Sequence, residues 1–358
     1  MNKLRVGVLG ATGMVGQRFI ELLSNHPWFE VVCVAASPQS AGKLYQDAVK
    51  NRWKLQSTIP DEVKKMKVLA VQENQRDIAK RVDFVFSALD MEKEVIKKVE
   101  EEYADLDIPV ISNNSAHRWT EDVPVIIPEI NADHLPLIDN QRKNRGWKRG
   151  LIVVKPNCSI QSYVSILTAL KEFKPQKVQV VSLQAISGAG KTFNDWPEMI
   201  DNIIPFIGGE EEKSEKEPLK IWGRFNNGTI VFAKKPSISA TCIRIPVSDG
   251  HLVSISVSFE KKPSKEQILE SIRTFKNPLK GLNLPSAPKK FIQYFEKENR
   301  PQTRLDRDFE HGMGITMGRL QEDKHFDWKF IALSHNTIRG AAGGAVLLAE
   351  LLVKKGYI

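Results

Sequence analysis

The sequence has few cysteines and no long apolar run. Its three cysteines, Cys33, Cys158 and Cys242, are an odd number at wide spacing, which is typical of neither a disulfide framework nor a zinc site. No apolar stretch reaches the roughly 18 residues that a membrane-spanning helix needs. The N-terminus, MNKLRVGVLG, opens directly on a strand pattern. We therefore expect a cytoplasmic protein with no membrane partner and no bound metal.

Acidic residues are also in short supply relative to basic ones, and the formal net charge at pH 7 is +9. The lysines and arginines are spread among the acids rather than gathered in one block, so we expect no nucleic-acid partner. The excess of positive charge instead favours attraction of small anions such as phosphates and carboxylates. With 358 residues, 41% of them hydrophobic and 27% charged, the chain is long enough for two globular domains.

The first half of the chain alternates strand and helix patterns. Strands are predicted at 3–9, 29–36, 82–89 and 108–113, and the second of these is a continuous apolar run typical of a strand buried on both faces. Apolar residues at helical spacing cover 14–24, and a Lys/Glu-rich helix is predicted from about 91 to 103. This alternation predicts a Rossmann-type, doubly wound parallel sheet with right-handed crossovers.

After Cys158 the pattern changes to longer strands in which apolar and polar residues alternate. They are predicted at 177–187, 239–247, 251–260, 314–320 and 327–334. Such alternation predicts an α+β domain whose antiparallel or mixed sheet has one face covered by helices. One helix should begin at a capping box of Ser264 and Gln267. A final helix at 338–355 should pack on the first domain, and 286–308 should be irregular.

Three glycines follow the first predicted strand. Gly10, Gly13 and Gly16 stand where a strand turns into a helix, and such a turn lets the backbone approach a pyrophosphate at the helix N-terminus. The spacing is G-x-x-G-x-x-G rather than G-x-G-x-x-G, so a tight turn without a ligand is the alternative. The strand–turn–helix context favours the nucleotide.

The end of the second strand indicates which nucleotide would bind. A NAD site usually has Asp or Glu there, on the ribose 2′-hydroxyl. Here the sequence reads VVCVAASPQSAGK, without a carboxylate. Ser37, Ser40 and Lys43 offer small donors and a cation that suit a 2′-phosphate. We therefore predict NADP(H), with a solvated loop as the alternative.

Cys158 is the candidate nucleophile. In VVKPNCSIQSYVSIL it lies between a short strand and a helical pattern, and a helix N-terminus there would lower its thiol pKa. The resulting thiolate would attack a carbonyl carbon. Cys33, in a continuous apolar run, fits a buried structural cysteine, and we expect Cys242, in an alternating strand pattern, to be a partly buried bystander. Among seven histidines, His251 opens a strand after an Asp-Gly turn and could project into a cleft as acid/base, although the sequence alone leaves this choice open.

A set of motifs in fixed order gives the chain a family resemblance. GATGMVG, PNCS, SGAG, IRIPVSDGH and NTIRGAAGGAVLLAE resemble the aspartate-β-semialdehyde dehydrogenases, and the archaeal and fungal branch more than the common bacterial one. The resemblance covers essentially the whole chain. It implies a glyceraldehyde-3-phosphate-dehydrogenase-like fold, with an NADP-binding domain of residues 1–157 and 337–358 and a catalytic and dimerisation domain of residues 158–336.

The resemblance also implies an activity. The family performs the reversible, NADP-dependent reductive dephosphorylation of L-4-aspartyl phosphate to L-aspartate 4-semialdehyde, in lysine, methionine, threonine and isoleucine synthesis. By this resemblance Cys158 forms a thioacyl enzyme, His251 moves the proton of the hemithioacetal oxygen, and Gln184 lies near the reacting centre.

Binding roles follow from the same resemblance. The implied substrate-binding residues are Arg244 for the α-carboxylate, Glu210 for the ammonium group, Lys213 and Arg118 for the phosphate, and Asn114 beside it. The implied cofactor-binding residues are Gly10, Thr12, Gly13, Met14, Val15, Ser37, Ser40, Lys43, Ser87, Ala88, Ser187, Gly188 and Asn336. Two points stay open: Glu210 has acidic neighbours that could shift its register by one, and SNNS departs from a more alanine-rich family stretch, which leaves phosphate contacts by Asn113 and Asn114 undecided.

Other functions remain as alternatives. Malonyl-CoA or succinyl-CoA reductases share the scaffold, nucleophile and cofactor, but Glu210 together with Arg244 favours an amino-acid substrate. N-acetyl-glutamyl-phosphate reductase fits the SDGH and GEEEK contexts less well. A catalytically inactive binding subunit conflicts with the intact set of Cys158, His251 and Arg244. We expect a homodimer or homotetramer, with the exposed face of the second sheet as its interface.

Overall fold

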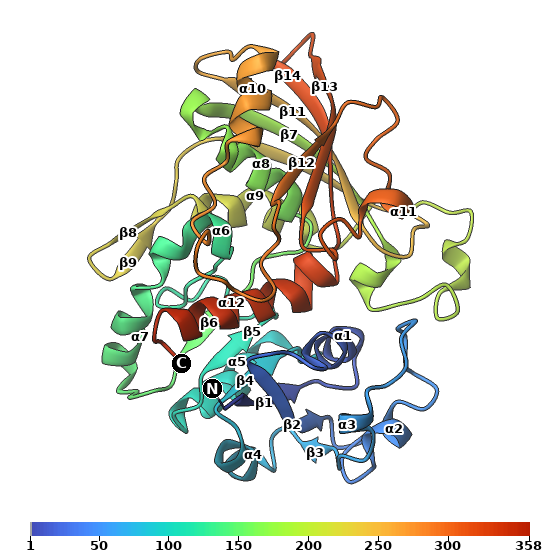
Figure 1. The fold of residues 1–358 in the computed structure, drawn as a ribbon, viewed down its shortest axis with the longest axis vertical. Helices are drawn as coiled ribbons and strands as arrows, with labels where there is room; N and C mark the ends of the chain where they lie inside the picture. Colours follow the sequence, from blue (N-terminus) through green and yellow to red (C-terminus); the bar gives the residue numbers. More distant parts are fainter. Residues whose placement is uncertain (1) are drawn as a thin grey trace.

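The computed structural model describes residues 2–358 and contains two six-stranded sheets (Figure 1). The first sheet lies at the bottom of Figure 1 in blue to green and is parallel throughout, in the order β3-β2-β1-β4-β5-β6. This is the strand order of a doubly wound dinucleotide-binding sheet, so the predicted fold class is confirmed. Its strands are β1 Leu4–Leu9, β2 Phe29–Ala36, β3 Leu69–Ala70, β4 Phe84–Ser87, β5 Val110–Ser112 and β6 Ile152–Val154.

Helices cover both faces of this sheet. The helices of the N-terminal half are α1 Met14–Leu23, α2 Tyr45–Ala48, α3 Asp61–Lys64, α4 Gln75–Arg81, α5 Lys93–Asp105, α6 Pro128–Asn131 and α7 Leu137–Arg145. Phe19 of α1 packs with Phe86 of the sheet on one face, whereas Val99 of α5 packs with Val110 on the other. Helix α5 begins later than the predicted 91–103 because Glu92 still has extended backbone.

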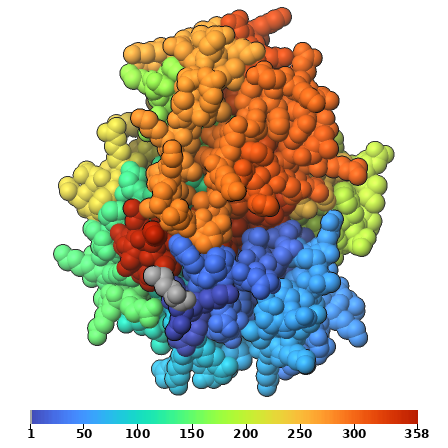
Figure 2. All heavy atoms as spheres, viewed as in Figure 1, coloured from blue at the N-terminus to red at the C-terminus, as the bar shows by residue number. Residues whose placement is uncertain are grey.

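The last helix returns to the first sheet, as predicted. α12 Gly343–Lys354 buries Val346, Leu348 and Leu351 in the same core as α1. The chain therefore ends beside its start, and the red C-terminal residues border the blue ones in Figure 2. No helix within residues 2–358 is long and apolar enough to cross a membrane.

The second sheet is mixed and has the order β10-β7-β11-β14-β13-β12. β10 pairs with β7 and β12 with β13 in parallel, while the other neighbours are antiparallel. Its strands are β7 Pro175–Gln184, β10 Ser237–Arg244, β11 His251–Phe259, β12 Ile292–Phe295, β13 Ile315–Glu322 and β14 Trp328–Ser334. A hairpin of β8 Arg224–Asn226 and β9 Thr229–Val231 stands apart.

The helices of this half are α8 Gln161–Ala169, α9 Glu210–Ile221, α10 Lys265–Arg273 and α11 Thr303–Asp306. α8 and α10 pack on one face of the sheet, and the capping box of Ser264 and Gln267 starts α10 as predicted. The predicted strand 177–187 ends at Gln184, because residues 186–189 form a 3₁₀ turn. The predicted irregular stretch 286–308 was wrong in part, since the short edge strand β12 and the helix α11 lie within it.

The segment before α12 departs from the predicted single helix. Ile338–Ala342 form a π-helical turn with a kink at Ala341, whose φ is −143° and ψ −109°. A Cβ at Gly340 would lie 2.6 Å from the Cβ of Cys158, so only glycine allows this close approach. The adjacent Arg339 is 1% exposed and forms a two-pronged ion pair with Glu129 at 2.6 Å for each nitrogen.

The buried pair of Arg339 and Glu129 should make a large contribution to stability only as a pair. We expect Arg339→Met to cost roughly 3–5 kcal/mol of unfolding free energy, because Glu129 is left charged and buried. The double variant Glu129→Leu/Arg339→Met should recover most of that loss. Equilibrium urea unfolding followed by tryptophan fluorescence measures both, and a single variant as stable as the parent chain would contradict the expectation.

Candidate active site

Four of the predicted site residues meet where the two sheets face each other. Gln184 and Arg244 end the parallel neighbours β7 and β10 and are paired in register. His251 starts β11, which runs antiparallel to β7, and therefore lies at the same edge. Cys158 follows β6 of the first sheet and places its Sγ 3.4 Å from Nε2 of His251. The topology thus brings together side chains that are distant in the sequence.

His251 is fully buried and its hydrogen bonds define its tautomer. Nδ1 accepts the backbone N–H of Ala185 at 3.1 Å, so the proton of the neutral ring is on Nε2, facing Cys158. Burial, and the positive charge of Arg244, lower the pKa of His251 to about 3. At neutral pH this ring is therefore an uncharged hydrogen-bond donor toward the sulfur.

The prediction that a helix N-terminus lowers the pKa of Cys158 was wrong. α8 begins at Gln161, three residues after the cysteine, so the sulfur is not in the first turn. Burial raises the pKa of the Cys158 thiol, and the charge of Glu210 raises it further. Three cations, Lys155, Arg118 and Arg244, act in the opposite direction. Cys33 is buried, as expected, and Cys242 is fully buried rather than partly so.

Glu210 starts α9 and points at the same centre. Its Oε2 accepts Nδ2 of Asn157 at 2.8 Å and lies 3.5 Å from Nε2 of Gln184, and its Oε1 pairs with Lys213 at 2.8 Å. Burial alone would raise the pKa of Glu210, but the adjacent Lys213 and the hydrogen bond from Asn157 outweigh it and lower the pKa. Glu211 instead accepts the backbone N–H of Cys242, and this favours Glu210 as the acid that faces the site.

Arg244 and His251 lie directly beneath the turn that follows β7. Nη1 of Arg244 donates to the carbonyl of Ala185 at 2.6 Å. A Cβ at Gly188 would lie 2.9 Å from Nη1 of Arg244 and 3.1 Å from Nε2 of His251. Because Gly188 has no side chain, Arg244 and His251 can occupy these positions.

Arg118 is held close by but retains an unused donor. Its Nη1 pairs with Glu217 at 2.8 Å, and Glu217 also accepts the backbone N–H of Asn157 at 2.8 Å. Within residues 2–358, the buried Nε of Arg118 has no hydrogen-bond partner. Glu217 was not predicted, because it lies in an acidic and lysine-rich run in which no single residue stands out.

Asn114 is placed differently from the other predicted substrate residues. Its amide nitrogen donates to Ser87 at 3.0 Å and to the buried Glu100 at 2.9 Å. Both amide hydrogens are thus used within the first sheet. The structure does not bring Asn114 into hydrogen-bond contact with Cys158, Glu210 or Arg244.

The glycine turn after β1 fits the pyrophosphate of a dinucleotide. Gly10 has φ +81°, and a Cβ there would lie 2.2 Å from the carbonyl oxygen of Ala88; a Cβ at Gly16 would lie 2.1 Å from the oxygen of Gly10. Gly13 precedes α1 without a side-chain cap, so the first N–H groups, those of Met14 and Val15, are open to an anion. Thr12 lies in this turn, and its carbonyl accepts Nε2 of Gln17.

The residues after β2 include one cation, Lys43, and are mostly exposed, apart from the buried Ser40. Ser37 and Lys43 are exposed, and Oγ of Ser40 accepts Nη2 of Arg52 at 3.2 Å. Arg52 was not predicted, because it lies nine residues after Lys43, outside the loop at the end of β2. It adds a second cation where a 2′-phosphate would be bound.

A cleft of about 370 Å³ connects the glycine turn to the turn at Ser187. Nδ2 of Asn336 donates to Oγ of Ser187 at 2.8 Å, and its Oδ1 accepts the N–H of Gly250 at 2.8 Å. Lys54 follows α2 in the first half of the chain, and its Nζ donates to the carbonyl oxygen of Gly190 at 2.7 Å. The residues around this cleft include Met14, Arg18, Lys54, Ser187, Lys191 and Arg307.

Comparison with known proteins places this geometry in a family. Residues 5–138 match the model described as semialdehyde dehydrogenase, NAD binding domain, and residues 167–339 match semialdehyde dehydrogenase, dimerisation domain. The chain is therefore a semialdehyde dehydrogenase by family. It is 44% identical to the aspartate-semialdehyde dehydrogenase of Archaeoglobus fulgidus over 99% of both chains, and 40% identical to that of Saccharomyces cerevisiae over 100% of both. The chain belongs to the aspartate-semialdehyde dehydrogenase family.

Solved structures agree with this assignment. The crystal structure of aspartate semialdehyde dehydrogenase with NADP from Candida albicans matches 100% of both chains with a TM-score of 0.88 and 37% identity. A Vibrio cholerae structure, aspartate semialdehyde dehydrogenase II complexed with ASA, has a TM-score of 0.75 at 22% identity and shows the shared fold alone.

Gly188 should be required for the placement of His251 and Arg244. We expect Gly188→Ala to lower kcat/KM by about 100-fold, because displacement of catalytic groups by an ångström can cost that much. Gly208→Ala is the matched control: Gly208 is also an exposed glycine before α9, but a Cβ there meets nothing within 4 Å. Steady-state kinetics with thermal melting separates lost activity from lost folding, and equal kinetics for the two variants would contradict the expectation.

His251 should remain neutral across the physiological range. Because the pKa of the folded-state ring, about 3, lies below the ordinary 6.5, the unfolded chain takes up this proton first as the pH falls. The contribution of His251 to stability is thus complete above about pH 6.5 and is lost progressively between there and pH 3. A ¹³Cε1-histidine NMR titration should show no His251 transition between about pH 5 and 8. A midpoint near 6.5 would contradict this assignment.

Proposed function

We propose that the chain reduces L-4-aspartyl phosphate to L-aspartate 4-semialdehyde with release of phosphate, reversibly and with NADP(H). The observation that carries this function is the 3.4 Å contact between Cys158 and His251, with the charges of Glu210 and Arg244 acting on the same sulfur. These groups provide a sulfur nucleophile, a neutral donor, an anion and a cation around one point. An amino acid with a reactive side-chain carbonyl matches that set.

The proposed reaction begins at Cys158. Its thiolate attacks the acyl carbon, a C–S bond forms, and the C–O bond to phosphate breaks with the electron pair leaving on phosphate. The result is a thioester on the enzyme. NADPH, when bound in the cleft, supplies the hydride that reduces this thioester.

His251 acts on the oxygen that becomes negative. The Nε2–H of the neutral ring donates a hydrogen bond to the alkoxide of the hemithioacetal, as an oxyanion-stabilising group does. Collapse of the alkoxide breaks the C–S bond and returns the thiolate of Cys158 with release of the aldehyde. No net proton transfer to His251 is needed, in keeping with its low pKa.

Charge complementarity supports the substrate assignment. The planar guanidinium of Arg244 suits the α-carboxylate, and Glu210 suits the ammonium group. The unpartnered Nε of Arg118 and the nearby Lys213 suit the phosphate oxygens. We assign Gln184 to the same centre through its contact with Glu210. Asn114 is assigned to the support of this loop rather than to direct phosphate contact, because Ser87 and Glu100 occupy its amide.

The cofactor proposal is NADP(H) rather than NAD(H). No carboxylate ends β2, and Ser40 with Arg52 and Lys43 offers a site for a 2′-phosphate. The turn 10–15 would hold the pyrophosphate, Ser87 and Ala88 would border the adenylate, and Ser187, Gly188 and Asn336 would border the nicotinamide.

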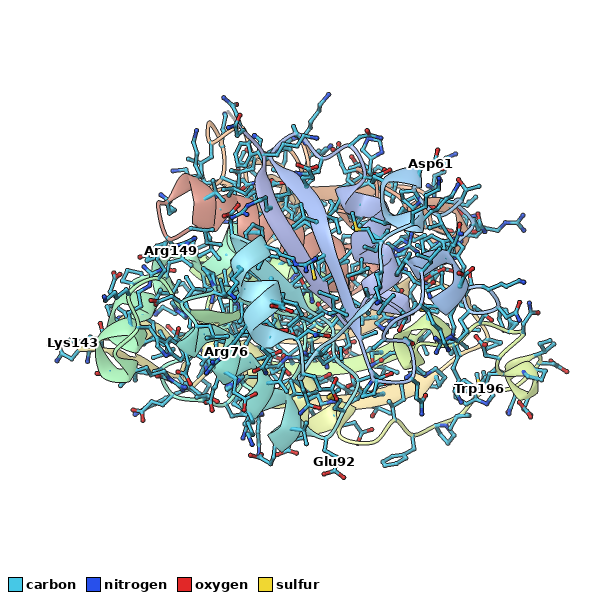
Figure 3. All side chains as sticks on the ribbon, turned by 90° about the horizontal axis from the view of Figure 1, so that it is seen from below. Asp61, Arg76, Glu92, Lys143, Arg149 and Trp196 are labelled. Carbon is cyan, nitrogen blue, oxygen red and sulfur yellow. The ribbon has the colours of Figure 1, made fainter. Side chains whose placement is uncertain are left out.

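We also propose a division of labour and an assembly. Residues 1–157 with 337–358 would form the cofactor domain, and 158–336 the catalytic and dimerisation domain. A homodimer or homotetramer is consistent with exposed apolar side chains of the second half, which include Ile200, Ile203, Phe206, Val231 and Phe232. Surface charges of both signs are dispersed, and Figure 3 shows Asp61, Glu92 and Lys143 far apart. We therefore propose no nucleic-acid partner. We also propose that the protein is located in the cytoplasm.

A substrate panel tests the function most directly. We expect NADPH formation from L-aspartate 4-semialdehyde with phosphate, and none from malonic or succinic semialdehyde, because only the former offers both charges that Glu210 and Arg244 bind. Each aldehyde is assayed by absorbance with phosphate and with CoA as acceptor, and with NADP and NAD. Turnover with CoA and a substrate without an amino group would overturn the substrate assignment, and equal turnover with NAD would overturn the cofactor preference.

A further inference from the structure

Several buried cations lie near Cys158, and most of them have a carboxylate partner. Arg118 pairs with Glu217 at 2.8 Å, Lys213 with Glu210 at 2.8 Å, and Arg339 with Glu129 at 2.6 Å. Within residues 2–358, Arg244 and Lys155 form no such pair. Arg244 is assigned above to a substrate carboxylate. The charge of Lys155 is therefore the one without a counterpart.

Lys155 is buried beside the nucleophile and has no substrate group assigned to it. It is 2% exposed, follows β6, and is three residues before the nucleophile. Its Nζ donates to the adjacent carbonyl of Pro156 at 2.5 Å, and no other hydrogen bond of this ammonium occurs within the described residues. An ammonium group carries three donors and is costly to bury without an anion. A partner that becomes negative during the reaction would account for its retention.

The C-terminal segment shows that the two side chains are neighbours. A Cβ at Gly344 would lie 3.2 Å from Cε of Lys155, and a Cβ at Gly340 would lie 2.6 Å from Cβ of Cys158. Gly340 and Gly344 are four residues apart in the segment where the kinked turn passes into α12. Lys155 and Cys158 thus both pack against the same short stretch of chain, residues 340–344.

We propose that Lys155 is a positioning residue whose buried ammonium stabilises the thiolate of Cys158. The inference rests on the proposed function, in which that thiolate is the nucleophile, and it names the residue that makes it available. The proposal explains how a half-buried thiol beside Glu210 ionises although α8 begins too late to help.

The electrostatics agree with this pairing in both directions. Burial lowers the pKa of Lys155 to about 7, and the largest opposing influence is the charge of Cys158. Conversely, Lys155 is the largest influence that lowers the pKa of Cys158, ahead of Arg118 and Arg244. The other charged groups that face this pair are Glu210, Glu217 and Arg339, of which Glu217 and Arg339 are engaged in ion pairs within the protein and Glu210 is paired with Lys213.

The test measures the reactivity of Cys158 without any substrate. Iodoacetamide alkylation of the Cys158 peptide, quantified by mass spectrometry as a function of pH, reports the apparent pKa of the thiol. In Lys155→Met we expect this profile to move to higher pH and the rate at pH 7 to fall by about tenfold, the factor for a one-unit shift. Lys155→Arg should restore most of the rate. An unchanged profile in Lys155→Met overturns the proposal.

A second buried lysine provides the matched control. Lys220 is 3% exposed but donates to the carbonyls of Arg118, Val123 and Thr120, and is not among the groups that shift the pKa of Cys158. Lys220→Met should leave the alkylation profile unchanged; an equal shift there would show a general effect of lost charge and would overturn the specific role of Lys155.

Thermal melting separates this role from a structural one. Because methionine keeps the length of the side chain and removes a buried charge, Lys155→Met should melt no lower than the parent chain. A lower midpoint with an unchanged alkylation profile would show that Lys155 is structural only. If Lys155→Met does not fold, Lys155→Gln is measured in the same way. Since alkylation involves no aldehyde, phosphate or NADP, a failed substrate assignment would leave these results intact.

Discussion

The contact between Cys158 and His251 joins the two halves of the molecule, and the rest of the site is arranged around it. The sulfur belongs to the loop after β6 of the parallel sheet, whereas the imidazole belongs to the first residue of β11 in the mixed sheet. Neither sheet alone forms the site. The backbone N–H of Ala185 donates a hydrogen bond to Nδ1 of His251 and so fixes the ring. Because Gly340 has no side chain, the C-terminal segment packs closely against Cys158. Small changes at either support should therefore act on chemistry rather than on folding.

Burial has the largest effect on the pKa values of Cys158 and His251. Removal from water lowers the pKa of the histidine, which keeps the ring neutral, and raises the pKa of the thiol, which disfavours the thiolate that the reaction needs. The surrounding charges decide the outcome. Most of those named above are engaged in pairs within the protein. Arg244 and Lys155 form no ion pair within residues 2–358, and in the proposed mechanism the substrate carboxylate and the thiolate are their partners. A neutral histidine then suffices, because the alkoxide requires a hydrogen bond and not a proton.

The parallel sheet, the glycine turn and the candidate nucleophile could be predicted from the sequence, because each depends on residues that are neighbours in the chain. Three evenly spaced glycines at a strand-to-helix turn, and one of only three cysteines next to a helical pattern, are distinctive local signals. The alternation of strands and helices was enough to predict the parallel sheet. The start of α8 was expected at the cysteine but lies three residues later, and the sequence did not reveal the burial and the charge of Glu210 that raise the pKa of Cys158.

Other features had no local signal. Lys155 and Arg52 are two among 52 lysines and arginines, and only tertiary structure distinguishes a buried or nucleotide-facing cation from a surface one. The π-helical turn at Ile338–Ala342 lies in an apolar run that continues unbroken into α12, so the pattern predicts one helix. Gly340 of this turn packs against Cys158, which is distant in the sequence, and the spacing of apolar residues along one segment does not reveal such a contact.

The central claim is that Cys158 carries the acyl group. Intact-protein and peptide mass spectrometry of the enzyme mixed with L-aspartate 4-semialdehyde and NADP, in the absence of phosphate, tests it. The account predicts an aspartyl adduct on the Cys158 peptide and none on Cys33 or Cys242, formed together with one equivalent of NADPH per site and discharged when phosphate is added. NADPH formation without an adduct, or an adduct on another residue, would contradict it.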